Sequence, residues 1–412
     1  MPPAEDAYRR KWGVVWLLCV VAALNYVDRT AISTVLPLLR ADLHLTDVQI
    51  ASAGTCFLWS YALGCPFAGY LSDRVRRGRV VFWSLLLWSL VTACTAFVRS
   101  VPELLVLRSL LGLVESAYLP AAVALIGDYH GPKTRATAMG MHIAGLNFGI
   151  VAGGATIGYL GGAIGWRTTF FIIGALGGVL AVFVWFYLRD PVWPPLVRLG
   201  TRPQSALALF RIPSATVVLS EMAIVSTCTW VFLNWLPLYF SEVQHQSLAG
   251  AGFSGTFFLQ MPAAIGVGLG GVLSDRVGAR HPERRMLLLG LGLLLSSPIL
   301  FAFSFSLSAA AISLCLLLFA LIRSTGQANE LPILTDLLEP GERASAFGIV
   351  NSANNIAGGA AVLASGFIKQ SVGLSGLFTL TFAAMFAAAL LCLLGYAKWM
   401  RRDVCAAEAR MA

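Results

Sequence analysis

Residues 69–74 read GYLSDR and residues 271–276 read GVLSDR, and each copy closes a long apolar stretch. A second similarity links DYHGPKTRATAMG at 128–140 with DLLEPGERASAFG at 336–348. In both members of this pair, an Asp is followed seven residues later by an Arg. Repeats that run in the same direction predict two related helical bundles about an axis along the membrane normal, with a binding site between them at mid-depth.

The composition around these repeats is that of a membrane protein. Of the 412 residues, 58% are apolar and 12% are charged, whereas a soluble domain has about 25% charged residues. A spanning helix needs about 20 apolar residues. We therefore predict an all-α membrane protein with twelve transmembrane helices in two pseudo-symmetric six-helix bundles. The predicted helices cover 13–38, 47–70, 80–99, 102–125, 136–161, 168–188, 214–240, 249–272, 285–305, 308–330, 344–367 and 374–398.

One polar stretch divides the chain into halves. Residues 189–213 read RDPVWPPLVRLGTRPQSALALFRIP and are rich in Pro and Arg, which favours a linker over a helix. The predicted domains are therefore an N-terminal bundle at 1–188, a cytoplasmic linker at 189–213, and a C-terminal bundle with a short tail at 214–412.

The positive charges are distributed as membrane topology requires. The net charge is +9, and 22 of the 29 Lys and Arg residues lie in the termini and in the loops on the same side as the termini. The positive-inside rule then predicts that both termini are cytoplasmic. Because topology accounts for the basic charge, nucleic acid is excluded as a partner. The four cations predicted on the opposite side are Arg40, Arg99, Arg167 and Lys369.

Cofactor chemistry finds no support in the sequence. Seven of the eight Cys residues lie within predicted helices and show no paired spacing, so we expect neither disulfides nor a metal site. Nothing resembles a phosphate loop, and no nucleophile and base recur at usable spacing, so we expect no enzyme. We expect no cofactor, with protons as the coupling ion.

The segment GYLSDRVRRGR at 69–79 resembles motif A of the major facilitator superfamily. Gly69, Leu71, Asp73 and Arg74 match that motif, while Arg76 stands where Gly is usual. The resemblance implies a conformational gate in which Asp73 latches one state and the arginines face anionic headgroups. A plain charged turn on the cytoplasmic side is the alternative.

A second stretch, GLNFGIVAGG at 145–154, resembles motif C of the same superfamily. Its glycines recur at a four-residue spacing, which predicts that this helix approaches a neighbour closely.

Three further stretches resemble the anion:cation symporter family, which couples organic anion uptake to protons. They are NYVDRTAIS at 25–33, FLWSYALG at 57–64 and RSLLGLVESAYLPA at 108–121. The resemblance implies proton handling at Asp28 and Glu115, substrate binding at Arg29 and Arg108, and a tyrosine near substrate at Tyr61. The first and third stretches also resemble Spinster-type lipid transporters.

Helix depth predicts how the buried charges pair. Asp28 lies fifteen residues into its helix, about 22 Å from the cytoplasmic edge at 1.5 Å per residue. Arg108 lies six residues beyond Pro102 on a helix that runs the other way, about 9 Å below the outer edge. These levels coincide in a core of about 30 Å. We predict that Asp28 pairs with Arg108, either as part of the mechanism or as a purely structural ion pair, and that Arg29 faces the cavity.

The repeat also places charges in the second half. An offset of 208 residues aligns Glu115 with Arg323, so we predict an acid that faces a base across the pore. Glu221 and Glu330 lie nearer the predicted cytoplasmic ends, where we expect water. Three deep arginines against Glu115 and Asp28 then leave a positive surplus, which a substrate carboxylate would balance. Glu115 is the preferred proton carrier and Asp28 the second choice.

These observations together predict a proton-coupled symporter of a small organic anion, such as a sugar acid or monocarboxylate. We expect a monomer in the bacterial cytoplasmic (inner) membrane. A Spinster-like lysolipid transporter and a transporter-like sensor that does not translocate its ligand remain alternatives. The predicted substrate-binding residues are Arg29, Arg108, Arg323, Tyr61 and Asn354.

Overall fold

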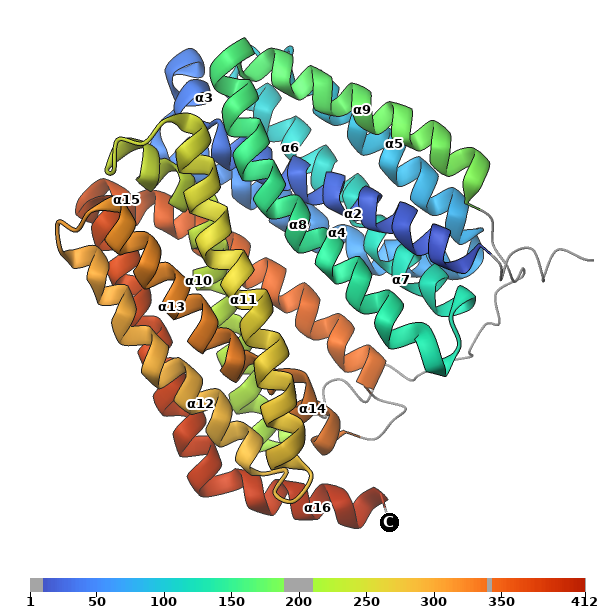
Figure 1. The fold of residues 1–412 in the computed structure, drawn as a ribbon, viewed down its shortest axis with the longest axis vertical. Helices are drawn as coiled ribbons and strands as arrows, with labels where there is room; N and C mark the ends of the chain where they lie inside the picture. The colour runs from blue at the N-terminus through green and yellow to red at the C-terminus, as the bar shows by residue number, and fades with distance from the viewer. Residues whose placement is uncertain (1–9, 189–209, 339–342, 412) are drawn as a thin grey trace, which may run out of the picture. The chain divides into compact units, whose positions relative to one another are not determined.

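The computed structural model describes residues 10–188, 210–338 and 343–411, and its regular elements there are helices. Figure 1 shows mostly long helices. Helices suit a lipid environment because they satisfy their backbone hydrogen bonds internally. The helices are α2 (Lys11–Thr34), α3 (Leu36–Leu43), α4 (Asp47–Arg74), α5 (Arg77–Thr95), α6 (Val101–Glu115), α7 (Tyr118–Tyr129), α8 (Pro132–Ile164), α9 (Trp166–Tyr187), α10 (Pro213–Glu242), α11 (Leu248–Gly278), α12 (Arg284–Ser296), α13 (Ala309–Gln327), α14 (Glu330–Leu337), α15 (Arg343–Gly395) and α16 (Arg401–Met411), with a 3₁₀ segment at Ser297–Ser304 and a π turn at Tyr396–Met400.

The structure confirms the predicted helical stretches. Ten segments of the described residues are long and apolar enough to cross a membrane. One of them, Val350–Ala407, contains two predicted helices that meet at Gly373, whose φ of 70° interrupts the helical path. With that segment counted as two and with α4 added, the described helices account for all twelve predicted spans.

Two predicted spans are interrupted. The span predicted at 102–125 divides into α6 and α7 around Ser116 and Ala117, and the span predicted at 308–330 divides into α13 and α14 around Ala328 and Asn329. Neither break itself contains Pro or Gly, but Pro120 follows the first closely, and Gly326 lies two residues before the second in a polar stretch, RSTGQANE at 323–330. Both breaks lie next to a buried charged side chain, Glu115 or Glu330.

The chain forms two compact units. The first contains residues 1–198 and 233–256, and the second contains 199–232 and 257–412. The predicted domain boundaries at 188 and 214 stay a prediction, since most of the predicted linker, 189–209, lies outside the described residues.

In the first unit, α2 packs against α8, α5 against α9, and α4 against α6 (Figure 1). The glycines of α8 explain the first pairing. A Cβ built on Gly149 would lie 2.2 Å from the carbonyl oxygen of Ala23, and one on Gly145 would lie 2.9 Å from that of Cys19. Only glycine permits this approach, so the close packing predicted for residues 145–154 is confirmed.

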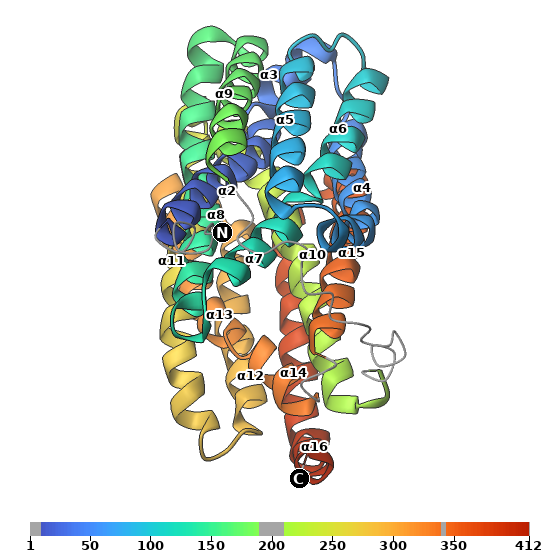
Figure 2. The same ribbon diagram turned by 90° about the vertical axis from the view of Figure 1, so that its right-hand side faces the viewer.

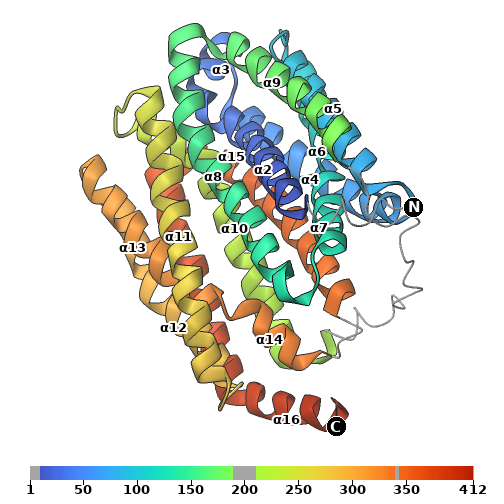
Figure 3. The same cartoon turned by 45° about the vertical axis from the view of Figure 1, so that its right-hand side comes forward.

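In the second unit, α12 packs against α13 and α15 (Figure 3), and α14 packs against α16 (Figure 2). A core of buried apolar residues from α10, α12, α14, α15 and α16 fills the space between these helices.

Each unit contains an equivalent, partly buried ion pair between an Arg and an Asp. Arg77 at the start of α5 pairs with Asp128 near the end of α7, and Arg285 at the start of α12 pairs with Asp336 near the end of α14. Each pair is separated by 51 residues. The equivalent contacts support the internal repeat that the sequence predicted for Asp128 and Asp336.

Candidate functional site

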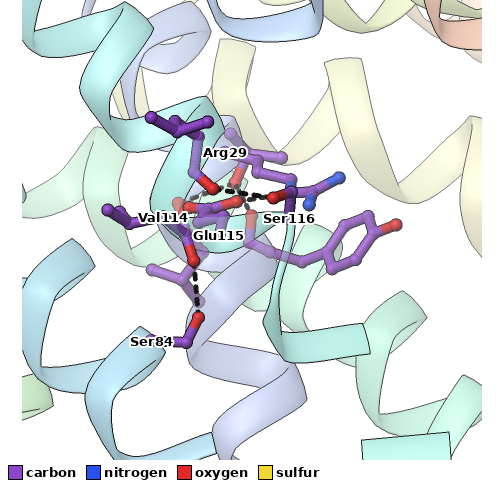
Figure 4. A network of polar contacts seen from close by, with 9 residues as sticks. Arg29, Ser84, Val114, Glu115 and Ser116 are labelled. Carbon is purple, nitrogen blue, oxygen red and sulfur yellow. Dashed lines mark hydrogen bonds and ion pairs between the residues drawn. The ribbon is translucent and has the colours of Figure 1, made fainter. Parts of the chain in front are cut away.

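A buried ion pair links α2 and α6 within the first unit. Arg29 of α2 donates from Nε to Oε2 of Glu115 at 2.8 Å, across 86 residues of chain (Figure 4). The Glu115 side chain is fully buried, and the Arg29 side chain is 9% exposed. A charge-assisted bond of this kind is about twice as strong as a neutral one, which fixes both side chains.

Three aromatic rings surround the Arg29 guanidinium. Its Cζ atom lies 4.5 Å from the ring centre of Tyr61, 4.8 Å from Tyr26 and 5.2 Å from Phe57. Each ring face attracts a cation. The rings and Glu115 together stabilise the positive charge of Arg29 in an apolar environment.

Arg108 of α6 contacts one of the same aromatic rings as Arg29. Its Cζ lies 4.7 Å from the ring centre of Phe57, so this ring contacts two guanidinium groups. Its Nε donates to the carbonyl oxygen of Ala53 at 3.4 Å, and the residue is 5% exposed. Arg108 is therefore held by α4 and not by a carboxylate.

The predicted pairing of Asp28 with Arg108 is wrong. Among the described residues, these two form no ion pair, and Asp28 Oδ1 has no hydrogen-bond partner. The depth estimate gave the height of each residue but not its direction around the helix. Arg108 turns toward α4, and the carboxylate that meets α2 is Glu115, which pairs with the neighbour of Asp28. Glu115 therefore has a partner in its own unit, which the sequence did not reveal.

The break between α6 and α7 places Glu115 at a helix end (Figure 4). Helix ends leave carbonyl groups without intrahelical partners. Here Ser84 of α5 donates to the carbonyl oxygen of Val114 at 2.6 Å, and Ser116 donates to that of Leu113 at 2.7 Å. Since Glu115 is the last residue of α6, the negative end of the helix dipole opposes an ionised carboxylate there.

Gly112 brings α4 and α6 together at this site. A Cβ at this position would lie 2.3 Å from the carbonyl oxygen of Phe57 and 3.0 Å from the backbone nitrogen of Tyr61. The glycine lies between Arg108 and Glu115 on α6. It therefore sets the distance between the charged residues of α6 and the aromatic residues of α4.

The predicted gate residues are only partly described. A Cβ on Gly69 would have nothing within 4 Å, and the Arg74 guanidinium stacks 3.9 Å from the ring centre of Tyr70. The side chain of Asp73 lies outside the described residues. The gate therefore stays a prediction.

In the second unit, Arg323 is buried and Asn354 is half-buried. The Asn354 carbonyl accepts from Ser226 at 3.3 Å. Glu221 and Glu330 are 1% and 7% exposed, so the expectation that water reaches them is wrong. Both act electrostatically on Arg323. Counted over both units, the buried carboxylates are four and the deep arginines are three, so the predicted positive surplus is also wrong.

Two members of the site were not predicted as functional. These are Tyr26 and Phe57, which lie close in sequence to predicted site residues. The spacing of Phe57 from Tyr61 was sufficient to predict it. It lies four residues before Tyr61 on α4, which places both on one helix face. The predicted residues that share the first unit's site are Asp28, Arg29, Tyr61, Arg108 and Glu115.

The fold agrees with the comparison to known families. The chain matches the Major Facilitator Superfamily over residues 18–329 and 263–404. The chain belongs to this superfamily. The twelve-helix arrangement in two bundles is the architecture of its members, and the resemblance of residues 69–79 and 145–154 to its motifs is consistent with that assignment.

Among curated relatives, the chain is similar to the probable galactarate/D-glucarate transporter GudP of Escherichia coli (strain K12). The two are 26% identical over 337 residues, which cover 72% of this chain and 74% of GudP. It is also 27% identical over 310 residues to the probable sulfoacetate transporter SauU of Cupriavidus necator, with 70% and 72% of the two chains covered.

Among solved structures, the chain is similar to a bacterial homologue of the human lysosomal transporter Spinster. The TM-score is 0.80 at 21% identity, with 96% of this chain and 98% of the other covered. At this identity the similarity supports the fold. This superfamily transporter is thus a multi-pass membrane protein, and the relatives GudP and SauU are named as probable transporters of small organic anions.

Proposed function

We propose that this chain is a secondary active transporter that moves a small carboxylate together with a proton by alternating access. The observation that carries the proposal is the Arg29–Glu115 pair, a buried guanidinium held by one carboxylate and three aromatic rings. Two relatives of the chain are named for the dicarboxylates galactarate and D-glucarate and for sulfoacetate, which supports an anionic substrate.

The geometry of Arg29 suits exchange of one carboxylate for another. Glu115 accepts from Nε, so it leaves the two terminal amino groups of the guanidinium to other acceptors. A planar guanidinium binds a carboxylate through two parallel hydrogen bonds. We propose that the substrate carboxylate binds these amino groups while Tyr26, Phe57 and Tyr61 form the walls beside it.

The same pair couples the substrate to a proton. An ionised Glu115 neutralises the positive charge of Arg29 and so weakens its attraction for the substrate carboxylate, whereas a protonated Glu115 leaves that charge to the substrate. The helix dipole of α6 already opposes the ionised form. Substrate binding therefore favours uptake of a proton by Glu115, and release of the substrate restores the ion pair. Asp28, buried beside Arg29, is the second candidate for a proton carrier, and Arg108 is a second anion-binding group.

The test separates binding from coupling. Substrate candidates are first found by a thermal-shift screen of the purified protein with sugar acids, monocarboxylates, sulfonates and lysolipids. We expect Arg29→Ala to abolish binding. Glu115→Gln should bind at least as tightly as the parent chain but lose proton-driven accumulation in proteoliposomes.

Two results would overturn the proposal. Unchanged proton-driven accumulation in Glu115→Gln would remove its role in coupling. A response to lysolipids with none to anions would favour the Spinster-like alternative. We further propose a bacterial cytoplasmic membrane with both termini in the cytoplasm, a monomeric state and no cofactor beyond the coupling proton.

A further inference from the structure

The second unit contains a buried group of charges that the proposed Arg29–Glu115 mechanism does not use. Glu221 lies on α10, Arg323 on α13, and Glu330 is the first residue of α14. Figure 3 labels these three helices. Their exposures are 1%, 8% and 7%. Along α10, Glu221 lies between Val218 and Val225, which belong to two separate apolar cores.

Each of the three side chains has a buried polar atom that lacks a partner. Within the described part of the chain, Glu221 Oε2, Glu330 Oε1 and Arg323 Nη1 make no hydrogen bond. Arg323 Nη2 donates only to the adjacent Ser324 hydroxyl, at 3.3 Å. Buried polar atoms in proteins nearly always have partners. Three unpartnered atoms in one group point to a small ligand that this group takes.

The charges do not balance when all three groups are ionised. Two carboxylates and one guanidinium give a net charge of −1 in a buried place, where an unpaired charge is costly. The surrounding helices supply no compensating cation among the described residues that face the group. α10 and α15 contribute the thiols Cys228 and Cys392 beside the group, and α12 contributes the apolar Met286 and Leu289 to the core that contains Val218.

We propose that Glu221 and Glu330 together hold one exchangeable proton, which makes the second unit a proton-binding site separate from Glu115. Arg323 keeps one carboxylate ionised, and the proton neutralises the other. Because the two acids interact, the proton belongs to the pair and not to either residue. The guanidinium disfavours a metal ion at the same place, since it would repel a second cation. The presence of the proton does not depend on the proposed transport function, but its use in a transport cycle does.

Infrared spectroscopy of the full chain in lipid vesicles tests the proposal directly. A neutral carboxyl group gives a C=O stretching band that is distinct from that of a carboxylate and shifts in heavy water. In the parent chain at neutral pH, we expect a band from the pair. In Glu221→Gln the remaining Glu330 carboxylate balances Arg323, so the band should lose the area of one carboxyl group. Glu330→Gln should lose the same area for the same reason.

The control is Glu103→Gln, which changes an exposed acid at the start of α6 and should leave the band unchanged. In Glu221→Gln and Glu330→Gln, the new side chain has the shape of a protonated Glu, so we expect both variants to fold as the parent chain does. If either variant keeps the full band area across pH 5–9, the pair holds no proton and the proposal is overturned. A metal-dependent loss of the band in the parent chain would overturn it in favour of a cation.

Transport measurements then show whether the site is used. With an anion identified by the thermal-shift screen, Glu221→Gln should bind it as the parent chain does but take up one proton fewer per anion. Failure to find a transported anion would contradict the proposed function and leave the infrared result standing. A lost band with unchanged proton stoichiometry would confine the site to a structural role and overturn its part in coupling.

Discussion

Gly112 gives the most direct test of how this site is built. A Cβ at this position would lie 2.3 Å from the carbonyl oxygen of Phe57. Carbon and oxygen atoms in comfortable contact are about 3.5 Å apart, so Gly112→Ala must move α6 away from α4 by about 1.2 Å. The nearest obstacles are backbone atoms of Phe57 and Tyr61, which cannot rotate away as a flexible side chain would.

We expect two effects from Gly112→Ala. Overpacking of this kind costs about 1–3 kcal/mol of stability, which should lower the melting temperature of the purified protein. The shift also moves Arg108 and Glu115 relative to the rings on α4, and displacements of about 1 Å at a positioned site cost up to roughly 100-fold in function. Affinity for the transported anion should therefore fall by tenfold or more, as measured by titration in detergent.

The matched control is Gly140→Ala on α8. A Cβ there would have nothing within 4 Å, so affinity should stay at the parent value and the melting temperature should be no lower, because Ala favours a helix over Gly. If Gly112→Ala matched this control in both measurements, α4 and α6 would not be held together as the structure describes. The account of the site would then be refuted.

Three further measurements address separate parts of the structure. Tyr61→Phe should retain anion affinity because the ring keeps its place over the guanidinium. Tyr61→Ala should lower anion affinity roughly 2- to 30-fold, equivalent to about 0.5–2 kcal/mol for a cation–π contact. An equal loss of affinity in both variants would show that the hydroxyl, not the ring, matters. A double-mutant cycle on Arg77 and Asp128 should give a coupling energy of about 0.5–3 kcal/mol in thermal or chemical unfolding, and additivity would contradict the pair. In a chain without native Cys, Arg99→Cys should react with a membrane-impermeant maleimide on intact cells, while His281→Cys should react only after permeabilisation; the reverse pattern would invert the proposed topology.

The sequence predicted the helices well because lipid burial imposes long apolar runs that need no tertiary information. It missed the breaks after Glu115 and before Glu330, because each segment is long enough to span the membrane as one helix and the breaking residues themselves are neither Pro nor Gly. The close packing of α2 on α8 was predictable from the glycine spacing at Gly145 and Gly149, because a missing side chain has a direct geometric meaning.

The pairing of charges was harder to predict. Distance along a helix gives depth, but the partner of a charge depends on the direction of its side chain and on the bend of the helix that carries it. Asp28 and Arg108 lie at compatible depths and still do not pair, while Arg29 and Glu115 do. Position along the helix was equally misleading for Glu221, which lies eight residues after the first residue of α10 and is 1% exposed.

Charge counting links the proposed transport function to the two acidic sites. Adding one substrate carboxylate to Arg29 and one proton to Glu115 leaves the net charge of the first site unchanged, so import of a monoanion with one proton moves no charge across the membrane. A dianion with one proton would move one negative charge, and the membrane potential, negative inside, would oppose its entry by about 2.3 kcal/mol per 100 mV. A second proton from the Glu221–Glu330 pair would remove that opposition. Accumulation of a dicarboxylate should therefore be insensitive to an imposed potential in the parent chain and sensitive in Glu221→Gln. In Glu221→Gln only Glu115 titrates, so accumulation of a monocarboxylate with one proton should be insensitive to the potential in that variant.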